Sequence, residues 1–178
     1  LISTDPLSPG TVYSAGVTSD GTVGLYRVEV SISSGTGKLK LAGGVTGAMK
    51  ESVQRAFSFL LAKKGELGVA RDLDVSDLHV EVIDLLANRV EAEVGVAFFM
   101  ACYSAIRKTP VSPALLILGD MSVQGNIKPL RSLIEPLQVA KDNGAKRALI
   151  PIENKRNFLD VSADIIEHVD PTFYGDPK

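Results

Sequence analysis

The chain has 178 residues, of which 45% are hydrophobic and 22% are charged, and its formal net charge is -2. These values are typical of one globular domain that buries roughly 70% of its unfolded-chain surface. The weak negative charge argues against binding of nucleic acid or anionic membranes through bulk electrostatics, because phosphate binding needs clustered Lys and Arg. Any DNA contact is therefore expected only through other parts of a longer protein.

Cysteine usage and hydropathy indicate a cytoplasmic protein without a membrane span. Cys102 is the single cysteine, so an internal disulfide is excluded and no cysteine cluster is available for a metal. The apolar run at 96–106 is too short to cross a bilayer, and the N-terminus lacks a signal-peptide pattern. Because the sequence opens at Leu1 instead of methionine, we expect a domain excised from a longer chain.

The first half of the sequence predicts three strands and a helix. Residues 1–10 contain two prolines and are expected to form a loose arm, while 11–178 are expected to form a single domain. Alternating residues predict strands at 12–18 and 23–33 around an Asp-Gly turn, and a third strand at 38–42 would complete an antiparallel meander. Apolar residues at helical spacing then predict a helix over 49–61.

The second half predicts alternating strands and helices. Strands are predicted at 78–83, 114–118, 148–152 and 165–169, and helices at 95–107, 129–142 and 154–159. The helix at 129–142 is expected to be interrupted near Pro136. The result is an α/β (α+β) fold with a mixed sheet packed against helices.

Two motifs were weighed as binding sites from the residues alone. The run Gly-Thr-Gly-Lys at 35–38 lacks the spacing and the Ser or Thr of a phosphate-binding loop, so a hairpin turn is predicted. His79 and Glu81 alternate on a strand and point to one face, with Glu93 nearby in sequence, so a metal site is conceivable. No helical His pair or Cys cluster supports it, and we predict no metal or cofactor in this domain.

Two longer runs resemble the proteolytic domain of Lon proteases. They are Gly-Asp-Met-Ser-Val-Gln-Gly-Asn-Ile-Lys-Pro-Leu at 119–130 and Lys-Arg-Ala-Leu-Ile-Pro-Ile-Glu-Asn-Lys-Arg at 146–156. Shorter matches lie at 35–39, 49–52 and 77–80, in the same order along the chain as in the family. The resemblance extends over 10–169. It implies the Lon proteolytic-domain fold, which is ribosomal protein S5 domain 2-like.

The resemblance also locates the positions of the Lon catalytic dyad. Lon domains use a serine in an Asp-Gly-Pro-Ser-Ala-Gly motif and a lysine in Gly-Gly-Leu-Lys. Counting from the matching segments places the serine at Glu93 and the lysine at Ile134. The residues that the resemblance implies for the vestigial cleft are His79, Glu81, Glu93 and Gly95.

Neither residue can replace its Lon counterpart. A serine hydroxyl needs a neighbouring base to become a nucleophile, and a side chain of isoleucine accepts no proton. A carboxylate at position 93 would also place negative charge where an oxyanion must develop. Loss of one member of such a unit lowers the rate on the order of a million-fold. Structure alone can favour Glu93, since a carboxylate at a helix start is stabilised by roughly 0.3–1 kcal/mol.

A narrower resemblance is to the Lon-like C-terminal domain of the AAA+ protein of BREX bacteriophage-exclusion systems. It is carried by the departure around position 93 and by Asp-Pro-Thr-Phe-Tyr-Gly-Asp-Pro at 170–177. This resemblance implies an upstream ATPase that uses ATP and Mg, self-association into a hexamer-like ring, and DNA contact only through the full-length protein.

We therefore predict a pseudoprotease domain that serves ring assembly or regulation of an AAA+ ATPase in phage defence. The alternative is an active ATP-dependent endopeptidase with a rearranged site, for example a displaced dyad of Lys128 and Ser132. A third reading is a small ligand or metal in the vestigial cleft, which requires His79, Glu81 and Glu93 to converge in space.

Overall fold

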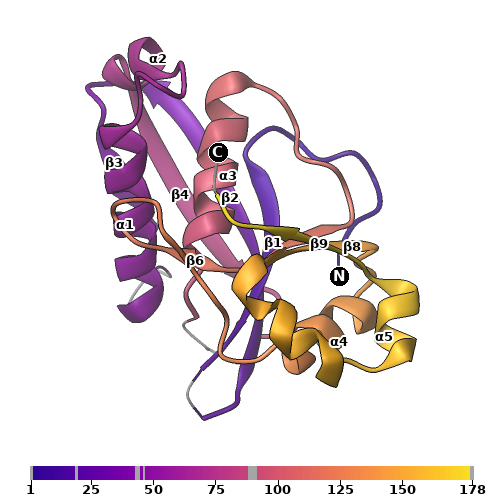
Figure 1. Cartoon of the computed structure of the whole chain (residues 1–178). Coiled ribbons are helices and arrows are strands. Elements are labelled where there is room, and N and C mark those ends of the chain that lie inside the picture. The colour runs from indigo at the N-terminus through magenta and orange to yellow at the C-terminus, as the bar shows by residue number, and fades with distance from the viewer. Residues whose placement is uncertain (1, 19, 43–44, 46, 88–91, 177–178) are drawn as a thin grey trace.

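The computed structural model describes residues 2–18, 20–42, 45, 47–87 and 92–176. Within these ranges, seven strands form one mixed sheet in the order β3-β4-β2-β1-β5-β8-β9, and two short strands form a separate hairpin, β6-β7. Helices cover parts of both sheet faces (Figure 1). The predicted fold class, a mixed α/β sheet packed with helices, is confirmed.

The elements alternate along the chain as follows. The strands of the large sheet are β1 Thr11–Val17, β2 Val23–Ser34, β3 Leu39–Leu41, β4 Ser76–Asp84, β5 Leu115–Ile117, β8 Arg147–Pro151 and β9 Asp170–Tyr174, and the hairpin strands are β6 Asp120–Met121 and β7 Ile127–Lys128. The helices are α1 Gly47–Ala62, α2 Ala70–Asp74, α3 Gly95–Arg107, α4 Ile134–Asp142 and α5 Ala163–His168, with a 3₁₀ helix η1 at Ile152–Asp160. No helix in the described part of the chain is both long and apolar enough to cross a membrane.

Two hydrophobic cores lie on opposite faces of the sheet. Successive strand residues point to opposite faces, so Val12 belongs to the core under α1 and α3, whereas Tyr13 belongs to the core under α4 and α5. The central strand β5 divides in the same way, with Ile117 in the first core and Leu116 in the second. Because both faces are covered here, the strand is apolar throughout, as its sequence suggested.

The third strand does not continue an antiparallel meander, and that prediction is wrong. Strands β1 and β2 form the expected antiparallel hairpin, but β3 pairs in parallel with β4. Both edges of β2 are already occupied, by β1 and by β4. The turn at 34–37 instead folds over the start of β4, where the Asp77 carboxylate accepts hydrogen bonds from the backbone N–H groups of Thr36 and Lys38 at 3.0 and 2.9 Å.

Two predictions in the C-terminal third are also wrong. The helix predicted at 129–142 begins only at Ile134 and has no interruption, because Pro136 is its third residue, where a backbone N–H would have no partner within the helix. The strand predicted at 165–169 is helix α5, which begins after Ser162, whose hydroxyl oxygen accepts the N–H of Ile165 at 3.4 Å. The edge strand follows it as β9.

The segment before β1, predicted to be a loose arm, lacks helix and strand in its described part but is attached to the domain. Ile2 is buried in the second core, and its N–H donates to the carbonyl of Asn143 at 2.9 Å. At the other end, Gly10 donates its N–H to Ser104 Oγ at 2.9 Å and accepts the N–H of Val30. These contacts run along one end of the sheet.

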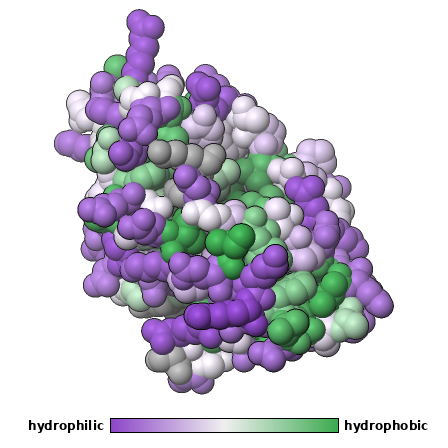
Figure 2. All heavy atoms as spheres, in the orientation of Figure 1, coloured by the Kyte–Doolittle hydropathy of each residue, from purple (hydrophilic) through white to green (hydrophobic). Residues whose placement is uncertain are grey.

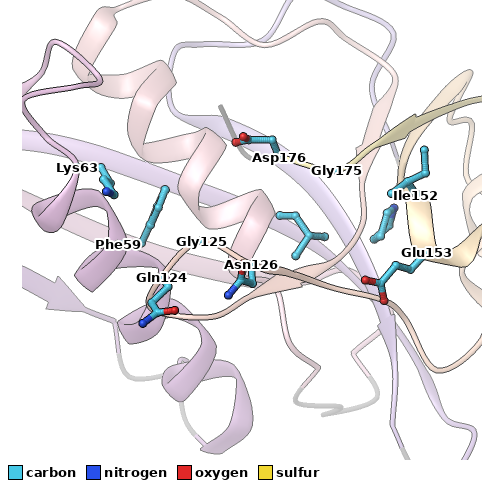
Figure 3. Close-up of a pocket in the computed structure, with 11 residues that line it drawn as sticks. Phe59, Lys63, Gln124, Gly125, Asn126, Ile152, Glu153, Gly175 and Asp176 are labelled. Atoms are coloured by element: carbon cyan, nitrogen blue, oxygen red, sulfur yellow. The ribbon is translucent and has the colours of Figure 1, made fainter.

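The β6-β7 hairpin is held against α1 by a close glycine contact. Gly125 lies in the hairpin turn with a φ of +86°, and a Cβ added there would lie 2.3 Å from a ring carbon of Phe59. Phe59 on α1 is buried and also packs against Phe99 of α3. The hairpin turn therefore lies directly over the Phe59 ring of α1 (Figure 3). This contact places β6 beside the helices.

Replacement of Gly125 by alanine tests this contact, with Gly21→Ala as the matched control. Both glycines have left-handed φ values, but a Cβ at Gly21 meets nothing within 4 Å. We expect the control to lower the free energy of unfolding by about 1 kcal/mol through backbone strain. Gly125→Ala should lose roughly 1–3 kcal/mol more, because Phe59 has little room to move. Urea unfolding followed by circular dichroism measures both. Equal losses would show that the ring contact contributes nothing.

Candidate functional site

Glu93 lies two residues before helix α3, in a short segment fixed by hydrogen bonds on both sides. The N–H of Ala92 donates to the Tyr26 hydroxyl at 3.2 Å, and the N–H of Val94 donates to Ser52 Oγ at 3.2 Å. Tyr26 comes from β2 and Ser52 from α1, and both are buried. The backbone at the position predicted for the Lon serine is therefore fixed between sheet and helix, while the Glu93 side chain remains 43% exposed.

One guanidinium nitrogen contacts two carboxylates at this point. Arg55 Nη2, from α1, lies 2.9 Å from Glu93 Oε2 and 2.7 Å from Asp120 Oδ2. Asp120 is the first residue of β6, and its side chain is only 7% exposed. We call Arg55, Glu93 and Asp120 the charge cluster. It joins α1, β6 and the start of α3 through a single cation.

Gly95 makes room for this cluster at the first turn of α3. A Cβ at Gly95 would lie 2.3 Å from Asp120 Oδ1, so any larger residue would displace the carboxylate. The resemblance placed Gly95 and Glu93 in the vestigial cleft, and the structure brings these two together around Asp120. Oδ1 of Asp120 and Nε of Arg55 are buried and have no hydrogen-bond partner among the residues that the structure describes.

The cluster makes Glu93 unusually easy to protonate. A hydrogen bond to Asp120, burial and the negative charge of Asp120 raise the pKa of Glu93 to about 7, against the opposing effects of Arg55 and Lys128. One cation cannot fully neutralise two adjacent carboxylates, so one of them keeps a proton more strongly. Close to neutral pH, Glu93 is therefore divided between a neutral carboxylic acid and a carboxylate.

A tyrosine from the last strand covers the other side of Asp120. The Tyr174 hydroxyl donates to the carbonyl of Leu118, and burial together with the Asp120 charge raises the pKa of Tyr174 above its usual range. A phenol that stays protonated is uncharged, and its hydroxyl can donate a hydrogen bond. The backbone two residues before Asp120 is thus bound to β9 by a neutral hydrogen bond.

A small hollow opens in front of the cluster. It has a volume of about 210 Å³ and is lined by Gly16, Val17, Glu93, Asp120, Lys128, Pro129, Leu130 and Arg131. Lys128 is the last residue of β7, and its positive charge lowers the pKa of Glu93. The hollow is too small for a folded substrate but leaves space for the Glu93 side chain to move.

Ile134, at the position of the Lon lysine, does not line this hollow. It is the first residue of α4, and its side chain is 44% exposed. The nearby Ser132 donates its hydroxyl to the Glu135 carboxylate at the start of the same helix, and it does not line the hollow either. Lys128 and Ser132, weighed as a displaced dyad, thus have different surroundings.

His79 and Glu81 lie elsewhere and do not join Glu93. Both line a separate hollow on the open face of β2, β3 and β4, where His79 Nε2 lies 2.8 Å from Ser33 Oγ. The convergence that the ligand or metal hypothesis required is not present. Across residues 2–18, 20–42, 45, 47–87 and 92–176, no group of three or more His, Cys, Asp or Glu residues is arranged to hold a metal ion.

A third hollow, of about 400 Å³, lies between the end of α1, the β6-β7 turn and the end of β9 (Figure 3). Lys63, Glu153 and Asp176 bring opposite charges to its rim. None of the three residues of the charge cluster lines it.

Sequence reasoning missed two of the three cluster residues. Asp120 was part of a run that resembles Lon, but no role was given to it. Asp120 could have been identified as a site residue from its place just after a strand predicted to be buried, because a buried charge needs a partner. Arg55 gave no comparable signal, since an arginine on an amphipathic helix is usually solvated.

Comparison with protein families gives one match that spans nearly the whole chain. The sequence profile of the Lon protease (S16) C-terminal proteolytic domain matches residues 7–174. The predicted recognition of a Lon proteolytic domain is confirmed.

Comparison with individual proteins agrees. The chain is 29% identical over 178 residues to the "Lon-like protease BrxL" of Escherichia coli O9:H4 (strain HS), covering 99% of this chain and 26% of that protein. It is 33% identical over 144 residues to the Lon protease of Buchnera aphidicola subsp. Schizaphis graminum (strain Sg), covering 80% of this chain and 18% of that protein. The Lon protease of Escherichia coli (strain K12) is 30% identical over 147 residues, covering 82% and 19%. The chain therefore spans about a quarter or less of the length of these relatives.

Removal of the shared cation tests the cluster, with a surface pair as the matched control. Arg55→Met keeps much of the side-chain volume but leaves Asp120 buried without a counter-charge. We expect it to lower the free energy of unfolding by about 3 kcal/mol. The control, Arg27→Met, breaks the more exposed pair with Glu29, whose atoms are 3.0 Å apart, and should change stability by about 1 kcal/mol or less. Chemical denaturation at pH 8 measures both, and a similar small effect at both sites would contradict the role given to Arg55.

Proposed function

The chain belongs to the family of Lon protease (S16) C-terminal proteolytic domains, and from that premise we propose that it is a member without peptidase activity. We propose that it serves assembly or regulation of an ATPase ring, in a Lon-like protein of the BREX phage-defence type. The supporting observation is the charge cluster at the position where Lon has its serine.

The cluster is incompatible with the chemistry of a serine peptidase. Attack on an amide needs an activated hydroxyl and a space where an oxyanion can be stabilised. Glu93 offers a carboxyl group that is already bound to Arg55, with the Asp120 carboxylate directly beside it. Negative charge next to the reacting carbonyl would oppose oxyanion formation.

A base is missing as well. Ile134 accepts no proton, and its exposed side chain does not face the hollow. Arg55 supplies a cation close to Glu93, but a guanidinium stays protonated in proteins and does not act as a general base. Lys128 lies at the hollow, where its charge lowers the pKa of Glu93, and Glu93 has no hydroxyl that could act as a nucleophile.

The proposed role in a ring extends the resemblance to the AAA+ protein of BREX systems. Proteins named Lon-like protease BrxL and Lon protease match this chain with about a quarter or less of their length. We propose that the remainder of the full-length protein carries the ATPase, uses ATP and Mg, and provides any contact with DNA. This domain would then contribute surfaces to a hexamer-like ring.

Exposed apolar side chains support a role in assembly. Among the described residues, Leu159 is 92% exposed, and Ile134, Ile152 and Ile166 are also exposed. They belong to α4, η1 and α5, and the surface in this region shows apolar atoms between hydrophilic ones (Figure 2). Burial of such side chains against a neighbouring subunit would gain roughly 25 cal/mol for each Å² of apolar surface removed from water.

Peptidase activity of the full-length protein is the direct test of the proposal. With ATP and Mg, we expect casein and peptide hydrolysis on the order of a million-fold slower than by a Lon protease with an intact dyad. Fluorescent casein and a short fluorogenic peptide give the rates.

Three variants identify the source of any hydrolysis. Cleavage that is lost in Lys128→Met or Ser132→Ala would contradict the proposal in favour of a displaced dyad. Cleavage that persists in both and in Glu93→Ala would point to a contaminating peptidase. A gain in Glu93→Ser with Ile134→Lys would show that the scaffold still permits the family's geometry.

Assembly is measured separately from hydrolysis. With nucleotide, we expect the full-length protein to sediment as a ring-sized oligomer, and Leu159→Asp with Ile166→Asp should shift it towards smaller species because charges would be buried. Analytical ultracentrifugation over a range of concentrations reports the mass. A full-length protein that stays strictly monomeric with nucleotide would exclude the ring role.

A further inference from the structure

The charge cluster has too few cations for its carboxylates. Arg55 Nη2 contacts both Glu93 and Asp120, so one positive charge faces two acidic groups. Oδ1 of Asp120 is buried and unpartnered among the described residues, so the aspartate can accept one more hydrogen bond than it receives. A protonated Glu93 can donate a hydrogen bond to Asp120, whereas a carboxylate at this position cannot. A shared proton would therefore stabilise the arrangement.

The two carboxylates differ in their freedom to move. Asp120 is 7% exposed, and its Oδ1 lies against Gly95 in the first turn of α3. Glu93 is 43% exposed and borders the hollow of about 210 Å³. Its neighbours Ala92 and Val94 are held by neutral hydrogen bonds to Tyr26 and Ser52, which do not change with pH in this range. Repulsion between two carboxylates can therefore be relieved by movement of the Glu93 side chain.

The hollow offers a second position for a Glu93 carboxylate. The charged groups that face Glu93 in the described part of the chain are Arg55 from α1, Asp120 from β6, Lys128 from β7 and Arg131 from the segment before α4. Lys128, the cross-strand neighbour of Asp120, and Arg131 line the hollow together with Glu93 and Asp120. A deprotonated Glu93 would be attracted towards them, while Arg55 would remain with Asp120.

From this geometry we propose that Arg55, Glu93 and Asp120 form a proton-operated latch. While the two carboxyl groups share a proton, Glu93 holds the start of α3 to α1 and β6. When the proton leaves to solvent, Glu93 moves into the hollow, and the cluster left behind is the neutral pair of Arg55 and Asp120. The latch goes beyond the proposed lack of peptidase activity and does not depend on it.

The pKa of Glu93, raised to about 7 from an ordinary value of 4.5, gives the direction of the pH dependence. Glu93 binds its proton more tightly in the closed state than in the open state. The equilibrium constant for opening therefore increases as the pH rises from about 4.5 to about 7, and it stays constant above that range. The increase is at most about tenfold per pH unit, the limit for one proton. The same sign applies to global stability, since the folded state keeps a proton that the unfolded chain loses.

Hydrogen–deuterium exchange of the full-length protein tests the latch, read by mass spectrometry on peptides that cover 92–99. After correction for the intrinsic pH dependence of exchange, we expect protection of the first α3 amides to fall between pH 5 and pH 7 and to level off above. Glu93→Gln, which cannot ionise, should remove this dependence. Lys128→Met should move the transition to higher pH, because a charge that favours the carboxylate is lost.

A matched control distinguishes the latch from a general effect of carboxylate removal. Glu29→Gln removes a carboxylate that pairs with Arg27 on β2, away from the cluster, and should leave the profile of the α3 peptides unchanged. A wild-type protein whose protection is flat across the range would overturn the proposal, and so would a Glu93→Gln variant with an unchanged dependence. Neither readout involves peptide hydrolysis, so failure of the latch and failure of the proposed function are separate results.

Discussion

The buried charge of Asp120 is the constraint around which this site is arranged. A carboxylate that is 7% exposed is strongly destabilising unless a cation and hydrogen-bond donors compensate it. Arg55 gives the cation from α1, Gly95 gives space in the first turn of α3, and Tyr174 from β9 covers the neighbouring backbone through its bond to the Leu118 carbonyl. Helices α1 and α3 thus meet at one acidic side chain of β6, and Glu93 adds a second carboxyl group to the same arginine.

The scaffold is largely independent of this chemistry. The two cores on opposite faces of the sheet are apolar, and the alternation of β1 and β5 between them fixes the register of the central strands. A Lon-like fold can therefore persist when its dyad positions change. The charges at the site must still be balanced. Here Arg55 and the proton proposed to be shared by Glu93 and Asp120 balance them.

The sequence predicted most of the regular elements because their patterns are local. Helix 95–107 was predicted with the bounds of α3, since its apolar run is long and ends at a left-handed Lys108. The partner of β3 could not be read in this way, because it depends on β2 having both edges occupied. The spacing of apolar residues also gave the wrong element at α5. Ile165 and Val169 are compatible with a strand or a helix, and the N-cap at Ser162 decides for the helix. Counting along the chain located Glu93 and Ile134, but Arg55 lies 38 residues before Glu93 and was joined to it only by the fold.

The change predicted at the two dyad positions would also alter how the halves of the domain are connected. In the arrangement that the Lon resemblance implies, a lysine at the start of α4 would reach the residue before α3, so that helices from opposite sheet faces meet across the site. Here the cation that contacts position 93 comes from α1, which packs on the same face as α3. The start of α4 is released from the site, and Ile134 is left partly exposed beside Ser132 and Glu135. The exposed surface at the start of α4 is therefore available for other contacts, which is the physical basis for the proposed assignment of α4 and its neighbours to assembly.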